Sequence, residues 1–145
     1  MPGAWLKSAT TVGSRCWPRF PKRRSAITTV GKAMDIVEGI GSDLVGVTVD
    51  VYHLWWDANL EGDLWRAGDS IFSFHVCDWR TPTRDVLNDR TLMGEGCIDI
   101  PQFRGWVEAA GFDGFIEVEI FSDENWQWDQ VDYIERIKDA YRAHV

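Results

Sequence analysis

Apolar residues recur every three or four positions between residues 30 and 40, which is the spacing of one face of an α-helix. Thr28 or Thr29 can cap the start of this helix, and Gly39 and Gly41 can end it. The pattern therefore predicts a helix that buries one side. Its apolar positions are Val30, Ala33, Met34, Ile36, Val37 and Ile40.

The chain beyond residue 43 alternates between short, nearly continuous apolar runs and amphipathic stretches. Such runs predict buried β-strands, whereas apolar residues at helical spacing predict helices. The predicted strands cover residues 44–50, 71–77 and 115–121, and the predicted helices cover 57–69, about 100–110 and about 129–143. The order αβαβαβα predicts the α/β class, with parallel strands that alternate with helices.

Local signals define the ends and the buried sides of the later helices. Asp99 and Pro101 favour a helix start near residue 100, because Asp caps a first turn and Pro fits within it. The connection before it, residues 78–100, shows no clear pattern, and loops of that length in compact domains are usually functional. We expect inward-facing side chains at Leu60, Leu64 and Trp65 in one helix, and at Val131, Ile134, Ile137 and Tyr141 in the last.

Three side chains with metal-binding chemistry stand where the predicted strands end. They are Asp50, His75 and Glu119. The carboxyl ends of parallel strands lie side by side on one face of a sheet, so these side chains are expected to converge. Carboxylates with an imidazole suit a divalent cation. Glu117 should share the face of Glu119, with a structural ion pair as the alternative reason for either carboxylate.

Charge divides the chain into two parts. Residues 1–34 hold seven of the 15 Lys and Arg and none of the 23 Asp and Glu. The remainder holds 8 basic and 23 acidic residues and therefore has a net charge of −15. An acidic body repels nucleic acid and favours cations or neutral polar ligands such as a sugar or polyol. No apolar run approaches the ~20 residues of a membrane span. We therefore expect neither a nucleic-acid partner nor a membrane partner.

The basic start of the chain, residues 1–25, shows no pattern of a packed element. Its composition is typical of an organelle transit peptide or of a solvated tail. A third interpretation is that it replaces a lost amino-terminal region through an altered translation start or reading frame. No secretory signal is present, and the three cysteines show no CxxC spacing, which together predict a reducing, cytoplasmic location.

Four motifs in a fixed order resemble the carboxyl-terminal half of the xylose isomerase-like TIM-barrel family of sugar phosphate isomerases and epimerases. They are Val47-Thr-Val-Asp50-Val-Tyr-His53, Phe74-His75-Val-Cys-Asp78-Trp79, Met93-Gly94-Glu-Gly96-Cys-Ile98-Asp99-Ile100 and Gly111-Phe-Asp-Gly114-Phe-Ile-Glu-Val-Glu119. The resemblance covers residues 26–145 and implies a partial (β/α) barrel that corresponds to about strands six to eight. At 145 residues the chain is shorter than the ~250 of a closed barrel.

The resemblance also implies a chemistry. Asp50, His75 and Glu119 match three ligands of the family's divalent metal, which is Mn²⁺, Mg²⁺, Co²⁺ or Zn²⁺. Glu119 also matches one of two carboxylates that move a proton on a keto sugar or polyol through an enediolate. The family's other carboxylate has no counterpart, because no Asp or Glu precedes Asp35. The resemblance therefore implies an isomerase or epimerase, impaired when alone. The nearest variant is a dehydratase that acts on an inosose.

Further residues have two interpretations each. His53 matches a contact to a substrate hydroxyl in the family, or it is a plain loop histidine. Arg84 can hold a phosphate or carboxylate, or it can pair with Asp85, Asp89 or Asp78. Trp55 can stack on a sugar face or pack in a core or interface.

Two other functions make different demands on the sequence. The family's endonuclease branch, which acts on DNA, needs more histidines than the three present, and a basic groove. The alternative from another class is a non-catalytic barrel remnant or assembly module. Its open sheet edge would pair with another chain, either a second copy or a complementary half-barrel.

Overall fold

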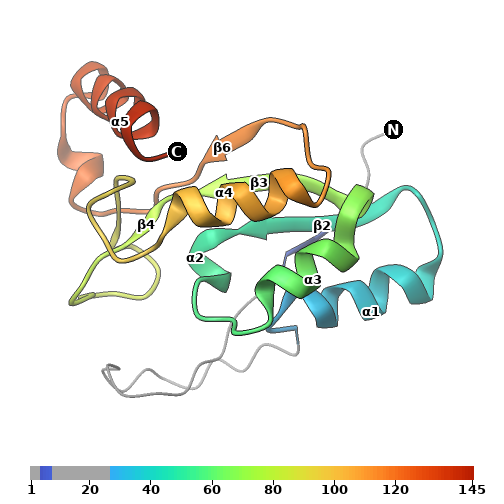
Figure 1. The fold of residues 1–145 in the computed structure, drawn as a ribbon. Helices are drawn as coiled ribbons and strands as arrows, with labels where there is room; N and C mark the ends of the chain where they lie inside the picture. Colours follow the sequence, from blue (N-terminus) through green and yellow to red (C-terminus); the bar gives the residue numbers. More distant parts are fainter. Residues whose placement is uncertain (1–3, 8–26) are drawn as a thin grey trace.

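A parallel sheet of four strands forms the centre of the molecule (Figure 1). The computed structural model describes residues 4–7, for which only the backbone is considered, and residues 27–145. The strand order is β1 (Ala4–Lys7), β2 (Val45–Asp50), β3 (Ile71–Val76) and β6 (Ile116–Val118). A separate antiparallel pair joins β4 (Asp78–Trp79) to β5 (Arg90–Thr91).

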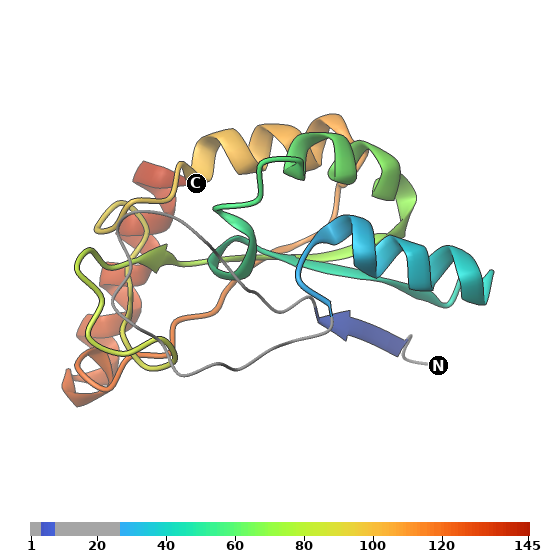
Figure 2. The ribbon, with the colours of Figure 1, turned by 90° about the horizontal axis from the view of Figure 1, so that it is seen from below.

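Helices cover one face of the sheet. Figure 2 shows three of them, α1, α3 and α4, above the strands, while α5 lies past the strand ends beside the β4–β5 pair. The helices are α1 (Val30–Ile40), α2 (Val51–Leu54), α3 (Leu60–Ala67), α4 (Ile100–Ala109) and α5 (Gln130–His144). Two short 3₁₀ helices, η1 (Gly68–Ser70) and η2 (Asn125–Gln127), join these elements. The predicted α/β class with parallel strands and alternating helices is confirmed.

The core lies between the sheet and these helices. Val49 of β2 and Phe74 and Val76 of β3 are fully buried there, together with Leu64 of α3 and Val107 of α4. Burying one such side chain contributes about 1.5–3 kcal/mol. The other face of the strands is polar: register pairs Thr48 with Ser73, Asp50 with His75, and His75 with Glu117. Strand alternation thus separates the packed side of the sheet from its polar side.

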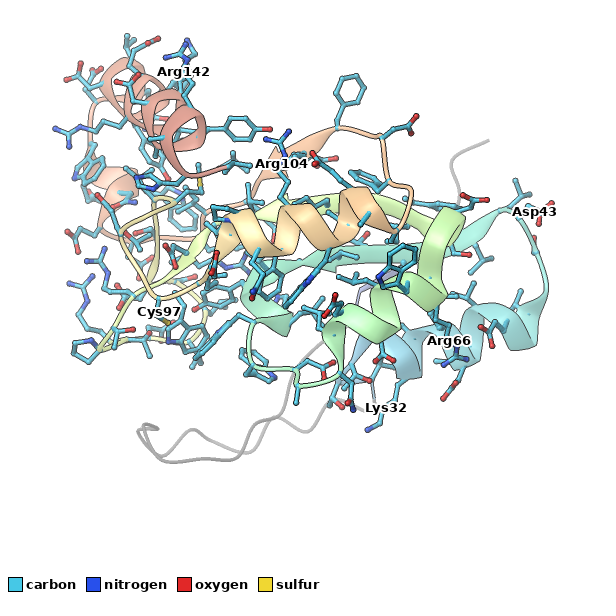
Figure 3. The ribbon with its side chains drawn as sticks, viewed as in Figure 1. Lys32, Asp43, Arg66, Cys97, Arg104 and Arg142 are labelled. Carbon is cyan, nitrogen blue, oxygen red and sulfur yellow. The ribbon has the colours of Figure 1, made fainter. Side chains whose placement is uncertain are left out.

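The predicted helix caps Thr29, Gly41 and Asp99 are confirmed. The Thr29 hydroxyl accepts a hydrogen bond from the Lys32 amide at 3.2 Å, and Gly41 ends α1 at a φ of 63°, a conformation that favours glycine. Asp99 accepts from the Gln102 amide at the start of α4. Arg66 of α3 reaches α1 and pairs with Glu38 at 2.6 Å (Figure 3). That pair is exposed, so it adds little to stability.

Some predictions were wrong. Strand β1 lies within the segment expected to hold no packed element, and it pairs in parallel with β2. Backbone pairing with β2 defines this strand, whereas the spacing of apolar side chains does not indicate it. The interpretations of the basic segment as a leader or tail lie outside the described residues. No helix in the described part of the chain has the length and apolarity to cross a membrane.

Three side chains expected to face inward do not. Trp65 is 59% exposed, Val131 70% and Ile134 50%, whereas Ile137 and Tyr141 do pack against the core. Val131 and Ile134 lie on the exposed side of α5, whereas Tyr133 in its first turn is buried and contacts Trp128. The connection 78–100, expected to lack regular structure, contains the β4–β5 pair.

Candidate metal centre

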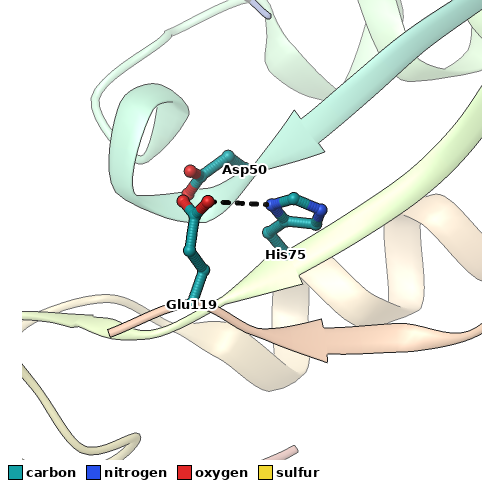
Figure 4. Close-up of side chains that lie close together, drawn as sticks. All are labelled: Asp50, His75 and Glu119. Carbon is teal, nitrogen blue, oxygen red and sulfur yellow. Dashed lines mark ion pairs between the residues drawn. The ribbon is translucent and has the colours of Figure 1, made fainter. Parts of the chain in front are cut away.

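Asp50, His75 and Glu119 converge at the carboxyl ends of three adjacent strands (Figure 4). Asp50 ends β2, His75 lies opposite it in β3, and Glu119 directly follows β6. The Glu119 amide donates to the Val76 carbonyl oxygen at 3.1 Å, which holds Glu119 against β3 beyond the end of its strand. One ligand atom of each side chain lies within 4.8 Å of the other two. The structure therefore brings the three predicted residues together.

Asp50 is fixed by the backbone and is nearly buried. Its Oδ1 accepts from the Tyr52 amide at 2.9 Å, as the cap of α2. Its Oδ2 lies 3.6 Å from His53 Nε2 and 3.6 Å from the Arg90 guanidinium. Burial raises the pKa of Asp50 to about 6, although Arg90 and the Tyr52 amide act in the opposite direction. One carboxylate oxygen is thus committed to the fold, and the other faces the centre.

His75 presents its two ring nitrogens to different carboxylates. Nδ1 lies 3.8 Å from Glu119 Oε1, and Nε2 lies 3.5 Å from Glu117 Oε2. Among the described residues, Nδ1 is buried and has no hydrogen-bond partner. A buried polar atom without a partner needs an explanation, and an ion is one of the usual ones. The ring nitrogen that faces Glu119 is therefore available to a metal.

Arg90 was missed from the sequence, yet it lies in the centre of this group. Its side chain is 2% exposed and donates to Glu119 Oε2 at 2.9 Å and to the Glu119 carbonyl at 3.1 Å. The guanidinium also stacks on Tyr52 and Phe121, at 4.3 and 4.8 Å from the ring centroids. The one sequence signal for Arg90 is that a basic residue stands close to the apolar residues Leu92 and Met93 in an otherwise acidic part of the chain.

Asp78 fixes the loop that follows β5. Its carboxylate accepts from the backbone amides of Trp79, Gly94, Gly96 and Ile98 at 2.8–3.0 Å. Burial raises the pKa of Asp78 even though these four amides favour its charged form. These amides tie the loop to Asp78 in the β4–β5 pair, in which Arg90 lies opposite Trp79.

The donor set fits a divalent cation. Two carboxylates and one imidazole are ligands that Mn²⁺ and Zn²⁺ accept, and three protein ligands leave positions for water or substrate. Asp50, His75 and Glu119 would hold the ion, with the vacant Nδ1 of His75 as one donor. Arg90 lies beside the two carboxylates and offsets part of their charge in the absence of an ion.

The remaining candidate residues lie at different distances from this centre. His53 borders it through Asp50, and Trp55 packs in an aromatic cluster with Trp56 and Trp79 nearby. The Arg84 guanidinium pairs with Asp89, and with Glu124 at 2.6 Å. That arrangement matches the ion-pair interpretation of Arg84 rather than the phosphate one.

A hollow at the opposite end of the sheet is not part of this centre. It lies at the amino ends of the strands and is lined by Asp43, Asp69 and Asp113 with neighbouring glycines. The chemistry-bearing side chains stand at the carboxyl ends, where parallel α/β sheets bind their ligands. We therefore place the functional site at the carboxyl ends.

Comparison with known proteins identifies the family. The model of the xylose isomerase-like TIM barrel family matches residues 16–143. The chain belongs to this family. The inosose isomerase of Halalkalibacterium halodurans, a relative of the chain, is 31% identical over 117 residues, which cover 79% of this chain and 42% of that protein. The predicted resemblance is thereby confirmed.

Solved structures of similar proteins agree with this membership. A protein from Sinorhizobium meliloti matches with a TM-score of 0.83 and 40% identity, over 95% of this chain and 48% of its own. The IolI protein with a bound zinc atom matches with a TM-score of 0.69 and 25% identity, over 79% and 42%. The chain thus spans less than half the length of these family members and corresponds to part of a barrel.

Proposed function

We propose that the chain carries the metal-binding and proton-transferring part of an isomerase or epimerase that acts on a keto sugar or keto polyol. The convergence of Asp50, His75 and Glu119 is the observation that supports this most directly. The relative named inosose isomerase supports the substrate class, because an inosose is a cyclic keto polyol. Sugar phosphates are the other substrates that family membership suggests.

The reaction moves a proton between adjacent carbons of the substrate. Glu119 would take the proton beside the carbonyl group, and negative charge would develop on the carbonyl oxygen as an enediolate forms. A divalent ion (Mn²⁺, Mg²⁺, Co²⁺ or Zn²⁺) on Asp50, His75 and Glu119 would supply positive charge that polarises this oxygen. Arg90 donates to Glu119 Oε2 at 2.9 Å and would hold this carboxylate in position.

Neighbouring side chains would orient the substrate. We propose that His53, whose ring lies 3.6 Å from Asp50, contacts a hydroxyl group, and that Trp55 covers an apolar sugar face. Arg84 would have to leave Asp89 and Glu124 to reach a phosphate. We therefore propose a structural role for Arg84.

A second chain would complete the site. One base at Glu119 serves one side of the substrate, whereas moving the proton also needs an acid on the other side. We propose that a complementary half-barrel supplies that carboxylate, and that the chain alone turns over little substrate. The second candidate function is a non-catalytic assembly module. It is favoured by the edges of the sheet, β1 and β6, which are unpaired within the described residues.

Metal binding is the first test of the proposal. Calorimetry should show that Mn²⁺ or Zn²⁺ binds to the wild-type chain and that His75→Ala abolishes the heat of binding. His144→Gln in α5 is the matched control and should bind as the wild type does. Equal binding by His75→Ala would exclude the proposed centre.

Activity separates an enzyme from an assembly module. Adding the amino-terminal half of a related barrel to this chain should give turnover of an inosose or ketohexose, and Glu119→Gln should abolish it. An assembly module would bind the added half without turnover. Robust activity of the unaided chain that survives Glu119→Gln would show that other residues carry the chemistry.

A further inference from the structure

Glu117 contacts the candidate metal centre without belonging to the group that could hold the ion. It stands two positions before Glu119, on the polar side of β6. The register of β3 and β6 places it directly opposite His75. Because strand pairing places Glu117 opposite His75, the backbone determines this contact.

The geometry around His75 gives Glu117 a specific task. Its Oε2 lies 3.5 Å from Nε2, while the other ring nitrogen, Nδ1, faces Glu119 at 3.8 Å. Among the described residues, His75 is the one ion-pair partner that Glu117 has. Nδ1 is buried and has no hydrogen-bond partner there. The two nitrogens therefore differ: one meets a carboxylate outside the centre, and the other points into it.

A neutral imidazole carries one proton and has one bare nitrogen. Only the bare nitrogen can bind a metal, and a carboxylate on the other nitrogen keeps the proton there. Outer carboxylates of this kind also fix the ring plane, and losing them typically costs about 10–100-fold in metal affinity.

We propose that Glu117 is a positioning residue for the metal centre. Its carboxylate, 3.5 Å from Nε2, would accept the Nε2–H of His75 and hold the ring in the tautomer whose Nδ1 lone pair faces Glu119. This role rests on the proposed function, because the tautomer of His75 matters only if a metal binds. The orientation itself exists in the metal-free chain.

The tautomer can be measured without a metal. Long-range ¹H–¹⁵N NMR spectra of the full chain at pH ~8 distinguish the two ring nitrogens, with His75→Gln used to assign the signals. We expect the Nε2–H form in the wild type and in Glu117→Gln, whose amide oxygen can still accept the proton. Glu117→Ala should give a mixture of both forms. A predominant Nδ1–H form in the wild type would overturn the proposal.

Metal affinity gives the second readout. Calorimetry with Zn²⁺ should show an affinity about 10-fold lower for Glu117→Ala and within about twofold of wild type for Glu117→Gln. Glu61→Ala, an exposed carboxylate of α3, is the control and should change nothing. A loss as large in Glu117→Gln as in Glu117→Ala would mean that Glu117 acts by charge alone, and would overturn the positioning role.

The two readouts separate this proposal from the proposed function. If the wild type bound no Zn²⁺ but kept the Nε2–H tautomer in a Glu117-dependent way, the function would fail while the orientation stood. If Zn²⁺ bound equally well to all the variants, the metal centre would stand and the role of Glu117 would fall. Dispersed amide spectra for each variant would show that it is folded.

Discussion

At Asp50, burial and the proposed metal binding act in opposite directions. Burial raises the pKa of this carboxyl to about 6, yet a metal ligand must be ionised. The side chain remains 9% exposed and is held by the Tyr52 amide, so it cannot turn away to water. Ionising Asp50 in the folded chain therefore costs free energy, which a bound cation would offset.

That cost should be visible as a pH dependence of stability. The raised pKa means that the folded chain holds this proton more tightly than the unfolded chain does. The stabilising contribution is complete below pH ~4 and is lost as the pH rises through about 6. Asp50→Asn cannot ionise, so its stability relative to wild type should rise by about 2 kcal/mol between pH 4 and pH 8.

Urea unfolding of the metal-free proteins measures this difference. Asp113→Asn, at an exposed position, is the control and should follow the wild-type curve. If the stability of Asp50→Asn and that of wild type changed in parallel over this pH range, Asp50 would not carry a raised pKa.

Arg90 should be the more costly side chain to remove. Replacing it with Met leaves Asp50 and Glu119 without their cation, and breaking a buried ion pair from one side costs about 3 kcal/mol or more. Arg66→Met removes exposed ion pairs with Asp35 and Glu38 and should cost much less, because solvent screens them. Urea unfolding compares the two. Similar losses would mean that Arg90 stays solvated in solution.

At the scale of elements, the loop after β5 depends on one carboxylate. Asp78→Ala leaves the amides of Gly94, Gly96 and Ile98 without their acceptor, so we expect a loss of about 2–3 kcal/mol. Hydrogen exchange should accelerate at these amides first. Asp85→Ala, which frees two amides in an exposed turn, is the control and should leave this loop unchanged.

The sequence predicted those elements whose signals are local. Thr29, Gly41 and Asp99 act within one helical turn, so the helix ends could be predicted without the fold. Asp50 and His75 could be predicted because parallel strands align their ends. The last strand is shorter than expected, ending at Val118, because it pairs on one side only within the described residues.

Features that depend on distant contacts could not be predicted in this way. Arg90 enters the centre because β5 lies beside the segment that follows β6, where the Arg90 amide donates to the Phe121 carbonyl oxygen at 3.0 Å. No spacing in the sequence encodes that contact. The exposure of Val131 and Ile134 likewise depends on what α5 packs against. In both cases the apolar periodicity predicts which side chains share a face of an element, but not which other element packs against that face.

At the scale of the whole molecule, the sheet corresponds to about half of a barrel and, within the described residues, has two unpaired edges, at β1 and β6. Phe115, before β6, is 90% exposed, and Val131 of α5 is 70% exposed. Open edges and exposed apolar side chains favour association. Sedimentation velocity should therefore show mass that increases with concentration, and Phe115→Ser should reduce this increase. Leu87→Ser, at an exposed loop position, is the control. A single monomeric species at all concentrations would contradict the prediction.

The alternation along β2 and β3 has a consequence for how such a protein can change over generations. Within each strand, successive side chains face opposite sides of the sheet: Val49 and Phe74 lie on the packed side, whereas Thr48 and Ser73 lie on the polar side. Replacements at Thr48 and Ser73 would therefore change the polar side while leaving the packed layer in place. Under the proposed function, such single replacements are a route to a different substrate preference.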